Sequence, residues 1–168
     1  LHTSDQGFYL QPGQEGERAS WTESVWHGAS HVLSGLDHIL FILTLTLLYR
    51  FGIPLLKAVA GFTLGHSLTL ALASLELVSP PSAAIELLIA LSILILVRET
   101  LNPETSRLKE SPSLLSCLFG LLHGFGFAGG LVQTGLPLNQ QLWELLWFNM
   151  GVEAAQIAIL SFSLTILF

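Results

Sequence analysis

Histidine and carboxylate side chains lie inside long apolar stretches of this 168-residue chain. An aspartate at the centre of a membrane helix costs about 2.5–3.5 kcal/mol on insertion scales, so such residues usually face a bundle interior and mark a function. Imidazole and carboxylate are ligands that suit divalent nickel, cobalt, zinc or iron. We therefore expect a divalent-metal site with these candidate ligands: His31, Asp37, His38, His66, Glu86, His123 and Glu153.

Further polar residues in the same stretches are expected to line the entry to this site or to hold its ligands in place. They are His27, Ser67, Asn149 and Gln156. His27, His31, Ser34 and His38 recur at i, i+4, i+7 and i+11, which places them on one face of one helix. The pattern predicts a polar track from one end of the bundle to its middle.

A plainer alternative is that each polar residue only makes a hydrogen bond between helices. That alternative is strongest for His27, which lies near the end of its stretch, and it also applies to Glu86. Ser67 could equally bond to its own helix backbone. The alternative is weak for the set at matching depth, which is Asp37, His38, His66, His123 and Glu153.

The composition indicates the elements that must hold these residues. The chain is 51% hydrophobic and only 11% charged, whereas soluble domains carry about 25% charged residues. A membrane-spanning helix needs about 20 mostly apolar residues. The stretches that fit are Val25–Tyr49, Ile53–Leu75, Ala83–Val97, Leu114–Leu131 and Leu142–Phe168. We predict an all-α, polytopic transmembrane helical bundle of about five spans.

Charge sets the expected orientation of this bundle. The connections that the five spans place on one side carry Arg50, Lys57, Arg98, Arg107 and Lys109, whereas the other side carries only Arg18. The positive-inside rule then places the N-terminus outside a bacterial cytoplasmic (inner) membrane. We expect residues 1–24 to form a polar extracytoplasmic tail and residues 25–168 a transmembrane domain. The net charge of −6 argues against a nucleic-acid partner, and the single Cys117 excludes a thiolate metal cluster.

Five motifs follow one another in a recognisable order. They are His31-x5-Asp37-His38 and the segments Phe62–Leu70, Glu86–Ser92, Phe119–Ala128 and Phe148–Glu153. This order resembles the HupE/UreJ family from about Trp26 to the end of the chain, with Gly65 and Ala155 standing where the family has Ala and Gly. The resemblance implies a membrane permease for nickel or cobalt, often linked to hydrogenase or urease maturation. It also implies that His31, Asp37 and His38 form one metal-binding motif and that His123 belongs to a second.

The residues leave more than one function open. The first is a permease or facilitator for Ni²⁺ or Co²⁺, with a site open to the outside. The second is a zinc-dependent intramembrane hydrolase with Ser67, Glu86 and Glu153 as candidate catalytic residues, in which a zinc-bound water attacks and a glutamate acts as the general base. The third is a structural metal-binding subunit of a membrane complex.

Coordination and access distinguish these functions. A closed three-histidine site with a lateral opening toward lipid favours the hydrolase, whereas a hydrated ion on an axial track favours transport. The sequence has no P-loop pattern, so we expect no ATP hydrolysis by this chain. The expected partners are the metal ion (nickel, cobalt or zinc), the lipid bilayer and a homo-oligomer or membrane-complex partner that the sequence does not identify.

Overall fold

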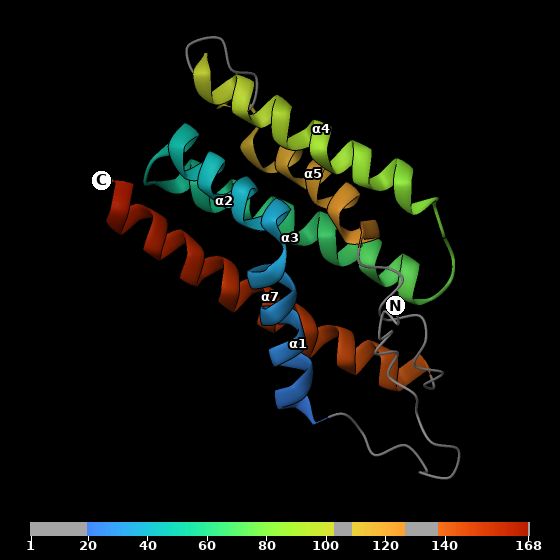
Figure 1. The fold of residues 1–168 in the computed structure, drawn as a ribbon. Helices are drawn as coiled ribbons and strands as arrows, with labels where there is room; N and C mark the ends of the chain where they lie inside the picture. Colours follow the sequence, from blue (N-terminus) through green and yellow to red (C-terminus); the bar gives the residue numbers. More distant parts are fainter. Residues whose placement is uncertain (1–19, 103–108, 127–137, 168) are drawn as a thin grey trace, which may run out of the picture.

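The computed structural model describes residues 20–102, 109–126 and 138–167, and these form six helices with no strand among them (Figure 1). This confirms the predicted all-α class. The helices are α1 (Trp21–Ser34), α2 (Leu36–Tyr49), α3 (Ile53–Ser74), α4 (Ser82–Leu101), α5 (Pro112–Gly126) and α7 (Leu138–Leu167). The end of the predicted fourth span, residues 127–131, lies outside the described residues.

Two helices are long and apolar enough to cross a membrane, namely Ile53–Ser74 and the segment Gln140–Leu167 of α7. The bent pair α1–α2 adds a third candidate span. Helix α4 has 20 residues but carries three charged ones, and α5 is apolar but has only 15 residues. The chain is therefore a helical membrane protein, while the count of five spans and the outward N-terminus stay predictions. So does the division at residues 24 and 25, which lies within α1.

The first predicted span is not one straight helix. α1 and α2 meet at Gly35 with a bend of 71°, and Figure 1 shows α1 turning away from α2 to lie across α7. Gly35 has extended backbone angles (φ −80°, ψ 105°), and glycine is a poor helix former. The expectation of one continuous histidine face was wrong for this reason. The apolar pattern runs through Gly35, but the helix does not.

The packing of α3 against α5 depends on glycines. A Cβ atom at Gly65 would overlap the backbone carbonyl of Cys117, and one at Gly120 would overlap that of Phe62. Gly61 lies against Ser113 at the start of the same contact, so the two helices run in the same direction. Small residues allow membrane helices to approach this closely. The backbones of α3 and α5 are therefore held in a fixed register.

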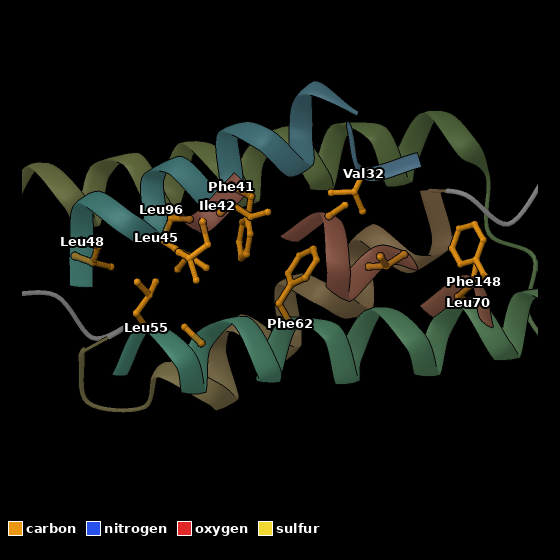
Figure 2. Close-up of a cluster of buried hydrophobic side chains, with 14 of the residues drawn as sticks. Val32, Phe41, Ile42, Leu45, Leu48, Leu55, Phe62, Leu70, Leu96 and Phe148 are labelled. Carbon is orange, nitrogen blue, oxygen red and sulfur yellow. The ribbon is translucent and has the colours of Figure 1, made fainter. Parts of the chain in front are cut away.

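An apolar core fills the end of the bundle where α2 ends at Tyr49 and α3 begins at Ile53, which we call the Arg50 end (Figure 2). Its side chains include Ile42, Leu45, Leu48, Leu55 and Leu96, each at most 5% exposed. The hydroxyls of Thr44 and Thr46 in this region donate to carbonyls of their own helix. The interior of the Arg50 end is therefore apolar, and the buried histidines lie farther from that end.

Candidate metal centre

Three histidines from three helices converge near the bend. His31 comes from α1, His38 from α2 and His66 from α3, and one ligand nitrogen of each lies within 4.8 Å of the other two. The ring centroids of His31 and His38 are 4.7 Å apart, and each lies less than 6 Å from that of His66. Three nitrogens bound to one ion at about 2.0–2.1 Å lie about 3.4 Å apart. Small side-chain movements would bring these three imidazoles into contact with a single ion.

Burial makes these imidazoles costly unless something binds them. His66 is 0% exposed and His38 is 2% exposed. Both ring nitrogens of His66 and the Nε2 atom of His38 have no hydrogen-bond partner within the described residues. Buried polar atoms are paired in the large majority of cases, so unpaired ones need an explanation. A bound cation would explain Nε2 of His38 and one of the two nitrogens of His66, because a neutral imidazole offers one lone pair to a metal.

Asp37 holds His38 in the orientation that such a site needs. The Nδ1 atom of His38 lies 3.2 Å from Oδ1 of Asp37, and the carboxylate can only accept, so the imidazole donates. The acceptor nitrogen Nε2 is thereby turned away from Asp37. Metal-binding histidines usually donate their second nitrogen to a carboxylate or a carbonyl in this way. Asp37 thus supports the site and supplies a negative charge next to it.

His123 of α5 is a fourth buried imidazole, 1% exposed. Its Nδ1 atom donates to the carbonyl of Phe119 at 2.8 Å, which leaves Nε2 as the acceptor nitrogen, and Nε2 is buried without a partner in the described chain. The ring centroid of His123 lies 5.4 Å from that of His38. We call His31, His38 and His66 the histidine cluster, and His123 borders it.

A cavity of about 370 Å³ lies beside the histidine cluster, between α2, α4 and α5. Its lining residues are Asp37, Leu40, Glu86, Ile89, Ala90, Ile93, His123 and Gly126. Leu40, Glu86 and Ala90 are exposed, so the cavity reaches the side of the bundle. The structure therefore brings Glu86 near Asp37 and His123 rather than among the three clustered imidazoles.

The remaining predicted site residues lie elsewhere. His27 on α1 and Glu153 on α7 are both exposed, and neither is brought to the cluster or the cavity. Their roles as ligand or entry residue stay predictions. The other three predicted residues tie α3 to α7. Ser67 donates to Asn149 at 2.8 Å, and Thr63 donates to the side-chain oxygen of Gln156 at 2.8 Å.

Phenylalanines around the imidazoles were not anticipated as part of the site. Phe41 and Phe62 have ring centroids 4.4 Å apart and are 1% exposed. The ring of Phe62 lies 5.0 Å from that of His123 and 5.9 Å from that of His66, and Phe148 lies 5.7 Å from His31. These rings keep water away and so strengthen electrostatic interactions at the cluster. A phenylalanine four residues before each of His66 and His123 was the available sequence signal.

Apolar spans around a buried imidazole cluster define a helical membrane protein with a candidate metal site. The class can be stated more narrowly, because residues 9–168 match the family model described as HupE / UreJ protein. The chain belongs to the HupE/UreJ family, which is linked to nickel and cobalt transport. No curated protein and no solved structure matches the chain.

Proposed function

We propose that this protein is a permease or facilitator that carries Ni²⁺ or Co²⁺ across a bacterial cytoplasmic membrane. The observation that supports this most is the histidine cluster, whose ligand nitrogens lie within 4.8 Å and whose buried His38 and His66 nitrogens lack hydrogen-bond partners in the described chain. The link of the HupE/UreJ family to nickel and cobalt transport supports the same function.

The ligand chemistry suits reversible binding. Imidazole nitrogens favour nickel, cobalt and zinc over magnesium and calcium, which prefer oxygen ligands. Structural zinc sites are closed by four protein ligands, whereas three leave a coordination position open. His31, His38 and His66 supply three, and the carboxylate of Asp37 offsets part of the ion's charge. An ion held this way can be selected and still be released.

The apolar core defines the barrier that transport must overcome. The cavity borders the histidine cluster at Asp37, which accepts a hydrogen bond from His38, whereas the Arg50 end is packed with buried aliphatic side chains. With the N-terminus outside, the Arg50 end faces the cytoplasm. Release on that side then requires the helices at the Arg50 end to move apart, as in alternating access.

Reconstituted protein tests the proposed function. Purified wild-type protein in liposomes that contain a metal-quenched dye should give saturable uptake of Ni²⁺ or Co²⁺. His66→Ala should abolish the saturable uptake, because it removes a fully buried ligand. Ser161→Ala is the control, since it removes an exposed hydroxyl that donates to the Ile157 carbonyl of its own helix, and it should transport as the wild type does. Equal uptake in wild type and His66→Ala would contradict the proposal.

The cavity gives one observation in favour of a second function, a zinc-dependent intramembrane hydrolase. Its walls are apolar at Leu40, Ile89 and Ile93, and Glu86 lies near the histidine cluster, where a general base would be needed. Of the other candidate catalytic residues, Ser67 is bonded to Asn149 and Glu153 is exposed on α7. Stoichiometric zinc retained through metal-free purification, with hydrolysis of a lipid ester or amide that Glu86→Gln abolishes, would favour this function over transport.

A further inference from the structure

Three ionisable side chains from three different helices line the cavity between α2, α4 and α5. Asp37 comes from α2, Glu86 from α4 and His123 from α5. Two carboxylates and an imidazole are a ligand set for a divalent transition metal. Neither Glu86 nor His123 belongs to the histidine cluster, so the cavity has ionisable lining residues of its own beside the cluster.

His123 lines this cavity, and a hydrogen bond within its own helix fixes its ring. Its Nδ1 atom is committed to the Phe119 carbonyl at 2.8 Å, and the Nε2 atom is buried with no partner in the described part of the chain. The residue is 1% exposed and yet lines the cavity. A buried acceptor nitrogen without a partner is destabilising, and a cation in the cavity would satisfy it.

The cavity has room for an ion that still carries water. A water molecule occupies about 30 Å³ in the liquid, so a shell of six takes about 180 Å³. The cavity volume of about 370 Å³ exceeds this. The histidine cluster, with its nitrogens within 4.8 Å and phenylalanine rings against it, admits only an ion that has shed most of its water.

We propose that the cavity is a loading site, in which Asp37, Glu86 and His123 receive a hydrated divalent cation before it passes to the histidine cluster. This inference rests on the proposed function and adds the route by which the ion arrives. Carboxylates bind a hydrated ion through charge and offset its two positive charges as it leaves bulk water. The imidazoles of the cluster then replace its remaining water.

The two sites adjoin closely enough for direct transfer. Asp37 lines the cavity and also accepts a hydrogen bond from His38 at 3.2 Å. The rings of His123 and His38 have centroids 5.4 Å apart. An ion that leaves Asp37 and His123 therefore meets His38 next. This route begins at the cavity between α2, α4 and α5 and does not use His27, which is exposed on α1 and does not line the cavity.

Binding kinetics of Co²⁺ to the purified full chain test the loading site. Stopped-flow recording of the visible absorption of imidazole-bound Co²⁺ reports filling of the histidine cluster. For the wild type, the observed rate should level off as Co²⁺ rises, because the loading step saturates. Glu86→Gln should lower the observed rate at low Co²⁺ concentration about tenfold, since a charge at the rim of a site acts mainly on the association rate. In this variant the observed rate should rise linearly with the Co²⁺ concentration, because the loading step no longer saturates. Its equilibrium affinity should stay within about threefold of the wild type.

Two matched controls separate the loading site from a general effect of charge. Glu76→Gln removes an exposed carboxylate just after α3 that does not line the cavity, and His27→Ala removes the residue of the axial alternative. Both variants should load at the wild-type rate. Unchanged loading in Glu86→Gln, or equal slowing by His27→Ala, would overturn the loading site and leave the proposed function intact. A wild-type protein that binds neither Co²⁺ nor Ni²⁺ would overturn both.

The loading site can also be observed with the cluster disabled. His66 is a member of the histidine cluster and does not line the cavity. His66→Ala should therefore keep a weak Co²⁺ site that titration calorimetry detects, and the double variant with Glu86→Gln should lose it. No residual binding in folded His66→Ala would contradict a separate loading site.

Discussion

Two helix pairs supply the imidazoles of this protein in different ways. α3 and α5 are regular helices whose glycines hold the backbones in contact, and they present His66 and His123 from fixed positions. α1 and α2 meet at the 71° bend and present His31 and His38 from either side of Gly35. A transported ion must be both bound and released, and a discontinuous helix next to a rigid pair allows ligand distances to change locally. We therefore regard α3–α5 as the fixed half of the site and α1–α2 as the adjustable half.

The largest effect is expected from removing the fixed half's ligand. His66→Ala deletes an imidazole that is 0% exposed and whose ring lies 5.6 Å from that of His38 and 5.8 Å from that of His31. Affinity for Co²⁺ or Ni²⁺ should fall by at least about 100-fold, because even losing an outer hydrogen-bond partner of a metal ligand costs 10–100-fold. Titration calorimetry measures this. A loss below about tenfold would mean that the other imidazoles form the site without α3.

Breaking the contact between α3 and α5 should instead affect stability. In Gly120→Ala the new methyl group meets the backbone carbonyl of Phe62 and the amide of His66, and neither can move without shifting the helix. Unfolding in detergent should become easier by about 1–3 kcal/mol, the range for overpacked cores. Thermal unfolding of the metal-free protein measures the change. A stabilised variant would show that the two helices are not held by this contact.

The bend offers the opposite result, a change in binding with little change in stability. A Cβ atom at Gly35 would lie 2.7 Å from Nδ1 of His38 and 2.8 Å from Oδ1 of Asp37, which are side-chain atoms that can rotate away. It would also lie 3.1 Å from the backbone oxygen of His31, which needs to shift by only a few tenths of an ångström. Gly35→Ala should therefore lower metal affinity about tenfold, as expected when a ligand loses its outer partner. The unfolding midpoint should stay near that of the wild type. The opposite outcome would be a Gly35→Ala protein that is clearly less stable but whose folded fraction binds the metal with wild-type affinity. In that case α1–α2 would not be the adjustable half of the site.

The sequence allowed the helices to be placed well but not the bend. α3 covers Ile53–Ser74 where Ile53–Leu75 was expected, because long apolar runs and their flanking polar residues mark the ends of such helices. The apolar pattern continues through Gly35, so nothing local predicts a 71° change of direction. The change of direction depends on the packing of α1 against α7. In that contact Gly28 lies against the backbone of Phe148, and Gly151 lies against the backbone of Val25.

The sequence allowed the types of residue in the candidate site to be predicted, but not which side of each helix faces the interior of the bundle. His38 and His66, which belong to the set expected at matching depth, meet with His31, which does not belong to that set. Asn149, Glu153 and Gln156 recur at i, i+4 and i+7 in the sequence, a spacing that places them on one side of a helix, yet Gln156 is fully buried and Glu153 is exposed. Which part of a helix face is covered depends on its neighbours, and a single sequence does not contain their positions. The cavity was missed for the same reason, since it is formed by three helices that are distant in sequence.

The smallest effect is expected from a substitution in the contact between α7 and α3, which supports the fixed half of the site without supplying a ligand. Gln156 accepts a hydrogen bond from Thr63, and its own amide nitrogen is buried with no partner among the described residues. In Gln156→Leu the Thr63 hydroxyl still has the carbonyl of Val59 at 3.1 Å to donate to, and the unpaired amide is gone. Unfolding should be unchanged or harder by no more than about 1 kcal/mol, and metal affinity should not change. Thermal unfolding and titration calorimetry on the same sample check both. A folded Gln156→Leu variant with weakened metal binding would instead show that Gln156 lies on the path of the ion. α7 would then contribute to the site as a third part, and the division into a fixed and an adjustable half would be wrong.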